Sequence, residues 1–141
     1  MQYYLSLGSN LGNKEQNLLQ ALQELKSRVG EVISCSTFHT TIPWGFDSDN
    51  NFLNAVCCLQ TSYTPHQVLS LTQQIEQNLG RTTKSIEGNY HDRLIDIDLL
   101  LCFDEQGRPI SVNAPDLQIP HPLMYQREFV MIPLHEIAPN F

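Results

Sequence analysis

The 141-residue sequence predicts an α+β fold of the ferredoxin-like type: an antiparallel sheet with helices packed on it and a C-terminal extension of loop and short helices. Three observations lead to this prediction. Segments with the alternation of strands and segments with the spacing of amphipathic helices follow one another in the order β-α-β-β-α-β. Each of the two helices crosses over between strands, which favours both on one face of the sheet. The length suits a single domain, expected to span residues 1–141.

The first half of the chain contains a strand, a helix and two further strands. Residues 2–8 alternate in the manner of a strand. Asn13 is a good helix N-cap with a Gln three residues later, and leucines at helical spacing follow until Gly30 ends the helix. Residues 31–41 are rich in β-forming residues and predict one second strand. After a loop rich in Pro, Gly, Asp and Asn, residues 52–60 predict the third.

The second half contains the other helix and the last strand. Thr64 caps this helix and Pro65 occupies its first turn, where a missing N–H costs nothing, while Gly80 closes it. Residues 81–93 form a polar loop, and residues 94–103 predict the fourth strand. A turn follows, and the rest of the chain is expected to mix Pro-rich loop with short helices.

Composition and charge exclude several classes of protein. The chain has 15 acidic and 8 basic residues, a net charge of −7, which argues against a nucleic-acid partner. No apolar run approaches the roughly 20 residues of a membrane span, and no export signal is visible at the N-terminus. The four cysteines lack metal-site spacing and are expected to be buried free thiols. We therefore expect a protein of the cytoplasm with no membrane partner.

Asp96 and Asp98 are the strongest local signal of chemistry. In a strand they project from the same face, about 7 Å apart, while Ile95, Ile97 and Leu99 point into the core. Two carboxylates on one rigid face suit Mg²⁺, which commonly takes substrate phosphates as further ligands. The alternative is an ordinary solvated strand face, because half-exposed strands carry polar residues on one side.

Two arginines and a glycine-containing loop strengthen a phosphate-binding interpretation. Arg81 and Arg93 flank the polar loop before the two acids, and a guanidinium can bind phosphate oxygens through two hydrogen bonds. Surface arginines paired with nearby acids remain the alternative. The Gly8–Gly12 segment lacks the lysine of a phosphate-binding P-loop, so a tight turn with a helix cap is the favoured interpretation.

Aromatic and amide side chains stand in and beside the loop before the third strand. Trp44 and Phe52 could stack on a planar heterocycle whose edge the Asn54 amide would recognise. A purely structural role for Phe52 in the core is the alternative. Near the C-terminus, His121 heads a second polar and aromatic group, for which a structural role also stays open.

Taken together, these segments resemble the 6-hydroxymethyl-7,8-dihydropterin pyrophosphokinase family of folate synthesis over nearly the whole chain. The segments that carry the resemblance are LGSNLG (7–12), TTIPWG (40–45), FLNAV (52–56), IEQNLGR (75–81), DRLIDIDLLL (92–101) and IPHPLMYQREFVMIPLHEIAP (119–139). Each alone is a weak pattern, but their succession in this order is highly specific. The resemblance implies a ferredoxin-like enzyme that transfers the pyrophosphoryl group of ATP to the hydroxymethyl oxygen of the pterin and releases AMP.

The resemblance also implies the composition of the site. Two Mg²⁺ ions would be held by Asp96 and Asp98, which with Arg81 and Arg93 form the expected catalytic set. The implied ATP-binding residues are Gln73, Glu76, Arg81, Arg93, Leu99, His121 and Arg127. The implied pterin-binding residues are Thr41, Ile42, Pro43, Trp44, Phe52, Asn54, Asp96 and Phe129. The expected partners are ATP and the dihydropterin alone, bound to a monomer.

Two departures and two rival functions accompany this interpretation. Relatives often carry Trp-Gly-Pro-Arg before the metal-binding strand, whereas residues 88–93 here read GNYHDR. Relatives also often have a further basic residue soon after the first loop arginine, whereas this chain has Thr82 and Thr83. A non-catalytic ferredoxin-like module would share the fold but has no use for both acids and both arginines. A two-metal phosphohydrolase would use the acid pair but gives no reason for Phe52, Asn54 and Phe129 together.

Overall fold

A computed structural model of the chain describes residues 1–41, 51–80 and 94–139. Its strands and helices follow one another in the expected order, with additional elements near the C-terminus. In chain order they are β1 (Gln2–Ser9), α1 (Lys14–Arg28), β2 (Glu31–Cys35), β3 (His39–Thr41), β4 (Phe52–Gln60), α2 (Pro65–Gly80), β5 (Asp96–Phe103), β6 (Val112–Ala114), β7 (Leu117–Ile119), the 3-10 turn η1 (Met124–Gln126) and α3 (Glu128–Ile137).

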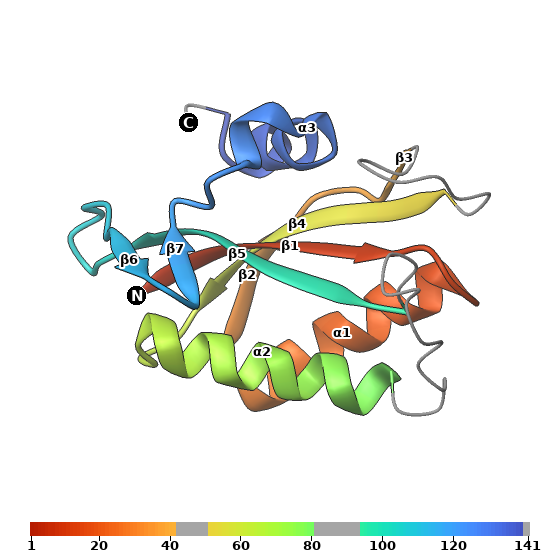
Figure 1. Cartoon of the computed structure of the whole chain (residues 1–141), viewed down its shortest axis with the longest axis horizontal. Coiled ribbons are helices and arrows are strands. Elements are labelled where there is room, and N and C mark those ends of the chain that lie inside the picture. The colour runs from red at the N-terminus through yellow and green to blue at the C-terminus, as the bar shows by residue number, and fades with distance from the viewer. Residues whose placement is uncertain (42–50, 81–93, 140–141) are drawn as a thin grey trace.

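The main sheet has the strand order β2-β4-β1-β5, and every neighbouring pair is antiparallel. β3 pairs with the beginning of β4, so β2 and β3 lie along the same side of that strand. Helices α1 and α2 cover one face of the sheet and α3 lies over the other (Figure 1). This is the ferredoxin-like arrangement predicted from the order of elements, with a third helix added on the second face.

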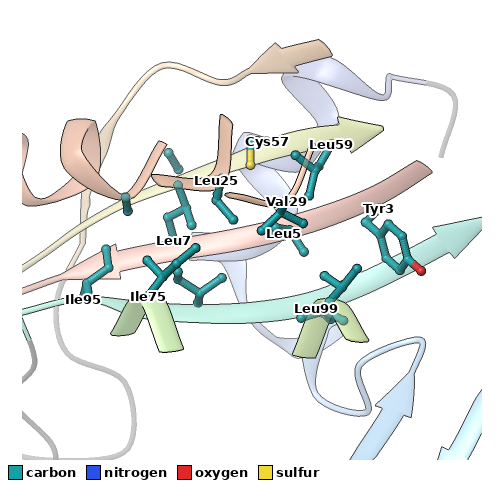
Figure 2. Close-up of a cluster of buried hydrophobic side chains, with 14 of the residues drawn as sticks. Tyr3, Leu5, Leu7, Leu25, Val29, Cys57, Leu59, Ile75, Ile95 and Leu99 are labelled. Atoms are coloured by element: carbon teal, nitrogen blue, oxygen red, sulfur yellow. The ribbon is translucent and has the colours of Figure 1, made fainter. Parts of the chain in front are cut away.

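The larger hydrophobic core lies between the sheet and the two helices α1 and α2 (Figure 2). Leu5 and Leu7 of β1 pack there with Leu25 of α1 and Ile75 of α2, and all four side chains are fully buried. A smaller cluster lies under α3 and includes Val56 of β4. All four cysteines are free thiols, and three of them are buried.

Side chains cap both helices as their sequences predict. The Asn13 side-chain oxygen accepts the Gln16 backbone N–H at 3.1 Å, which fixes the start of α1. At α2 the pairing is reciprocal, because the Thr64 backbone N–H donates to the Gln67 side chain at 2.9 Å and the Thr64 hydroxyl accepts the Gln67 N–H at 3.4 Å. This is the capping-box arrangement, which satisfies two otherwise unpaired donors of the first turn.

The single strand expected over residues 31–41 is instead two strands, β2 and β3. Between them the Ser36 backbone N–H donates to the Val56 carbonyl at 2.8 Å, but the Ser36 hydroxyl takes the place of its carbonyl as the return acceptor. Its hydroxyl accepts the Val56 N–H at 3.0 Å and donates to the Thr37 carbonyl at 2.8 Å. The run of β-forming residues carried no Gly or Pro that would have marked this break.

The C-terminal part of the chain is more regular than expected. Residues predicted as loop form the β6–β7 hairpin, and residues predicted as short helices include the ten-residue helix α3 with Pro133 inside it. The hairpin strands are three residues each, too short to give an alternating pattern. None of the described helices combines the length and apolar character needed to cross a membrane.

Candidate active site

The candidate site begins with a row of residues directly opposite one another across four strands. His39 of β3 pairs with Asn54 of β4, Asn54 pairs with Gly8 of β1, and Gly8 pairs with Asp96 of β5. Opposed residues of antiparallel strands point to the same face, and neighbouring strands lie about 4.8 Å apart. Asn54 and Asp96 therefore stand on the same face about 10 Å apart, with a residue that has no side chain between them.

Asn54 is held rigidly beside this gap. It is only 2% exposed, and its side-chain amide donates to the Thr41 hydroxyl at 2.5 Å. A methyl group placed on Gly8 would lie 2.9 Å from Asn54 Oδ1 and 3.5 Å from a ring carbon of Phe52. The missing side chain at position 8 thus lets the amide and the aromatic ring approach the floor of the site.

The two acids occupy the edge strand of the sheet. Asp96 and Asp98 are partly exposed, whereas Ile95, Ile97 and Leu99 are at most 5% exposed. This is the alternation expected from the sequence. The carboxylates stand on the sheet face that carries α3, opposite the core under α1 and α2.

Glu76 of α2 approaches the acids from the outer edge of β5. Its carboxylate accepts the Ile97 backbone N–H at 2.8 Å, between the two aspartates in the chain. Burial, together with the negative charges of Asp96 and Asp98, raises the pKa of Glu76 to about 8 despite that hydrogen bond. A cation bound by the aspartates would relieve this crowding of carboxylates.

The segment after β7 brings His121 to the same place. Its backbone N–H donates to the Leu100 carbonyl at 3.0 Å, and its Nδ1 accepts the Leu123 N–H at 3.2 Å. Burial and the nearby Arg127 charge lower the pKa of His121, against the opposing charge of Asp96. The lowered pKa favours the neutral ring, and because Nδ1 accepts the Leu123 N–H, the proton of the neutral ring belongs to Nε2.

A hollow of about 280 Å³ adjoins Asp98 and His121. Leu69 of α2 and Leu99 of β5 provide apolar lining. The remaining lining residues are Ile97, Pro115, Asp116, Leu117, Gln118 and Pro122. Those from Pro115 to Gln118 belong to the β6–β7 hairpin, and sequence reasoning missed them because no motif marks a hairpin that reaches the site through tertiary packing.

The remaining expected residues fall into three groups. Arg127 and Phe129 lie at the start of α3, with the guanidinium carbon 5.6 Å from the centre of the Phe129 ring. Gln73 is exposed on α2, three residues before Glu76. Five expected site residues lie outside the described residues: Ile42, Pro43, Trp44, Arg81 and Arg93.

The donor set at the acids suits a hard cation that keeps other ligands. Within the described residues no group of three or more His, Cys, Asp or Glu side chains is arranged to hold a metal ion. Asp96 and Asp98 provide two carboxylates, which is the number Mg²⁺ commonly takes from a protein that also binds phosphates. The residues present therefore fit Mg²⁺ shared with a phosphate ligand rather than a closed metal centre.

The Gly8–Gly12 segment runs from the end of β1 through a turn to the Asn13 cap of α1, so the turn and helix cap favoured from the sequence are confirmed. Gly12 has a positive φ of 66°, which suits glycine. The Asn17 side chain, in the first turns of α1, donates to Ser9 Oγ at 3.0 Å and to the Leu11 carbonyl at 2.9 Å. These two hydrogen bonds connect the helix to the turn before it.

Comparison with known proteins agrees with the geometry. The chain is 51% identical over 136 residues to a 2-amino-4-hydroxy-6-hydroxymethyldihydropteridine pyrophosphokinase of Porphyromonas gingivalis, covering 96% of this chain and 90% of the relative. It is 38% identical to the enzyme of the same name from Bacillus subtilis, covering 96% and 77%. These matches extend over almost all of the sheet, the helices and the candidate site.

A solved structure has the same fold. The HPPK-DHPS of Plasmodium falciparum, solved with pterin and p-hydroxybenzoate, superposes with a TM-score of 0.70 at 14% identity, covering 99% of this chain and 40% of the other. The model of the family described as 7,8-dihydro-6-hydroxymethylpterin-pyrophosphokinase (HPPK) matches residues 4–139. The chain therefore belongs to this family of folate biosynthesis, whose reaction is pyrophosphoryl transfer to hydroxymethyldihydropterin.

Proposed function

We propose that the chain is an ATP- and Mg²⁺-dependent pyrophosphokinase that binds the pterin and the phosphates on the α3 face of the sheet and the nucleoside of ATP at the adjoining edge of β5. The observation that carries this proposal is the row Asn54–Gly8–Asp96. It combines an amide suited to a heterocycle edge, an open floor and a carboxylate suited to a cation within about two strand spacings. The pterin would lie at the Asn54 end and the phosphates at the Asp96 end.

At the pterin end, Phe52 and Phe129 would hold the two faces of the ring while Asn54 recognises its edge. The hydrogen bond from Asn54 to Thr41 supports this role, because it fixes the orientation of the amide before substrate arrives. A pre-oriented polar group loses little conformational entropy on binding. Ile42, Pro43 and Trp44, which follow Thr41 directly, would complete the edge contacts.

At the phosphate end, Asp96 and Asp98 would hold two Mg²⁺ ions together with the triphosphate. The ions would neutralise phosphate charge and polarise the transferring group. Arg81 and Arg93, which precede β5 in the sequence, would contact the phosphates. The neutral His121 would donate from Nε2, since its Nδ1 accepts the Leu123 N–H.

The hollow beside Asp98 would take the nucleoside part of ATP. Leu69 and Leu99 offer apolar walls to a purine ring, and Gln118 offers polar contacts from the hairpin. Arg127 would add positive charge on the phosphate side. Gln73 and Glu76 follow Leu69 along α2, one and two turns further on. The Glu76 carboxylate accepts the Ile97 N–H at the edge of β5.

Catalysis on such a site rests mainly on position and charge. The hydroxymethyl oxygen would attack the β-phosphorus and give up its proton to solvent, the bond between that phosphorus and the oxygen shared with the α-phosphate would break, and AMP would leave. The pterin end and the phosphate end of the site stand on one sheet. Two bound substrates would therefore meet without a further loss of translational and rotational entropy. The arginines would offset charge that develops on the phosphoryl oxygens.

The test is AMP production from ATP with and without the hydroxymethyldihydropterin. AMP that depends on both the pterin and Mg²⁺ is the expected result. Asp98→Ala should abolish turnover with the fold intact, whereas Glu105→Ala, at an exposed acid in the turn after β5, should match the unchanged protein. Phosphate or AMP release that ignores the pterin would instead indicate a phosphohydrolase.

We also propose that residues 1–141 act as a single domain and as a monomer in the cytoplasm, without nucleic-acid partners. The net charge of −7 supports the last point, since a polyanion would be repelled. Light scattering coupled to size-exclusion chromatography tests the monomer directly. A concentration-independent mass near 16.1 kDa is expected.

A further inference from the structure

The C-terminal end of α3 is tied to the segment between β2 and β3 through one carboxylate. Glu136 accepts the Thr37 backbone N–H at 3.0 Å and the Thr37 hydroxyl at 2.9 Å, and it also contacts His39 Nε2. The Thr37 N–H and these side chains hold the pKa of Glu136 below its usual range. We refer to Thr37, His39 and Glu136 as the α3 clasp.

The clasp is more than a simple surface ion pair. An exposed pair of charged side chains contributes little, because water competes and both side chains lose freedom. Here the pair is partly exposed, but the Thr37 backbone N–H and the Thr37 hydroxyl donate to the same Glu136 carboxylate that contacts His39. Several hydrogen bonds that converge on one carboxylate define the position of the helix end relative to β3.

Helix geometry connects the clasp to the candidate pterin site. Glu136 lies seven residues after Phe129, which is almost two turns of helix, so both project from about the same face of α3. Val130 and Leu134 lie roughly 100° or more around the helix from that line and join Val56 of β4 in the smaller core, so Phe129 and Glu136 stand along the border of the buried face. The clasp therefore fixes one end of the helix stripe whose other end carries Phe129.

The other partner of the clasp, β3, carries residues of the same site. His39 lies opposite Asn54 in the register, and Thr41 accepts the hydrogen bond from the Asn54 amide. β3 has three residues, and within the described part of the chain it pairs with β4 alone. So short a strand gains much of its definition from the clasp at its beginning.

From this arrangement we infer that the α3 clasp is a positioning device for the pterin half of the site. Glu136 sets the spacing between Phe129 on α3 and the Phe52–Asn54 segment of β4, while His39 and Thr37 hold β3 so that Thr41 orients the Asn54 amide. The inference rests on the proposed pterin site and assigns it a support that the site residues themselves do not provide.

The experiment compares the two substrates on one variant. Glu136→Ala is expected to weaken the Kd for hydroxymethyldihydropterin about tenfold, since small displacements of positioning groups are costly. The Kd for an ATP analogue should change less than twofold, because the hollow lies beside α2 and β5, which the clasp does not touch, and Arg127 alone of the expected ATP contacts stands at the start of α3. Glu136→Gln should recover much of the pterin affinity, because an amide oxygen can still accept from Thr37.

Two further measurements separate positioning from general destabilisation. Glu24→Ala removes a similarly exposed carboxylate, one paired with Arg28 on α1 at 3.6 Å, and should leave both affinities unchanged. In the ligand-free protein, the NMR signals of the Asn54 side-chain amide should shift in Glu136→Ala and stay in place in Glu24→Ala. Thr37→Val offers a milder change if Glu136→Ala does not fold, since it keeps the backbone N–H.

The outcomes distinguish the clasp from the proposed function. If the unchanged protein binds dihydropterin and Glu136→Ala binds it equally well with unmoved Asn54 signals, the clasp is overturned and the function stands. Equal weakening of both ligands would overturn the positioning role in favour of a general structural one. If the unchanged protein binds no dihydropterin, the proposed function fails, and the role of the clasp fails with it.

Discussion

Gly8→Ala gives the sharpest test of how the site is built. The added methyl group would lie 2.9 Å from Asn54 Oδ1 and 3.5 and 3.8 Å from two ring carbons of Phe52. A separation of 2.9 Å is too short for a methyl carbon and an oxygen, so one of them must move. The Asn54 amide cannot turn freely, because it is 2% exposed and bonded to Thr41 at 2.5 Å.

The magnitude follows from these contacts. Gly8 does not have a positive φ, so alanine introduces no backbone strain and restricts the unfolded chain, a gain of roughly 0.5 to 1 kcal/mol. Overpacking costs about 1 to 3 kcal/mol. The net loss of stability should therefore be about 1 to 2 kcal/mol, while displacement of Asn54 should cost the pterin about 2 kcal/mol of binding energy, or roughly thirtyfold in Kd.

Titration calorimetry with each substrate, together with urea unfolding, measures both effects. Gly80→Ala is the matched control, because a methyl group there meets no atom of the described residues within 4 Å, and it should be neutral or slightly stabilising. The ATP affinity of Gly8→Ala should be nearly unchanged. Pterin affinity within twofold of the unchanged protein would refute the idea that the bare floor at Gly8 shapes the site.

Three other predictions concern the imidazole, the clasp and a close turn. His121→Gln, which can donate near the Nε2 position, should keep about tenfold more kcat/KM for ATP than His121→Asn; equal losses would contradict the neutral donor. The lowered pKa of Glu136 means that its stabilisation is present above its usual value of 4.5 and is lost as the pH falls through the lowered value. The stability difference between the unchanged protein and Glu136→Gln should therefore shrink below pH 4.5 in acid-titrated unfolding, and a constant difference would contradict this. Gly30→Ala would place a carbon 2.2 Å from the Gln60 carbonyl oxygen, so urea unfolding should reveal a loss of about 3 kcal/mol.

Local signals predicted most of the fold. Asn13 and Thr64 cap the helices as expected because capping depends on residues only three apart. The alternation around Asp96 and Asp98 correctly predicted which side chains are buried, since a strand has only two faces. The family motifs extended this reading to a function that no single segment could specify.

The features that the sequence did not reveal depend on contacts between distant segments. The break at Ser36 exists because its hydroxyl takes the Val56 N–H, a partner twenty residues away. The hairpin residues Pro115–Gln118 reach the hollow only because the chain returns to the edge of β5. Gly8 carried a recognisable signal, a glycine at the end of a strand, but its meaning depends on Asn54 in the neighbouring strand.

The outer edge of β5 has a consequence for association between molecules. An edge strand with open backbone groups can recruit a strand from another chain and begin aggregation. Here the Glu76 carboxylate accepts the Ile97 N–H. The His121 N–H donates to the Leu100 carbonyl, and the Ile110 N–H donates to the Cys102 carbonyl. The strand that carries both aspartates is thus occupied along its edge by its own chain, so a carboxylate beside the active site also protects the sheet from intermolecular β-pairing.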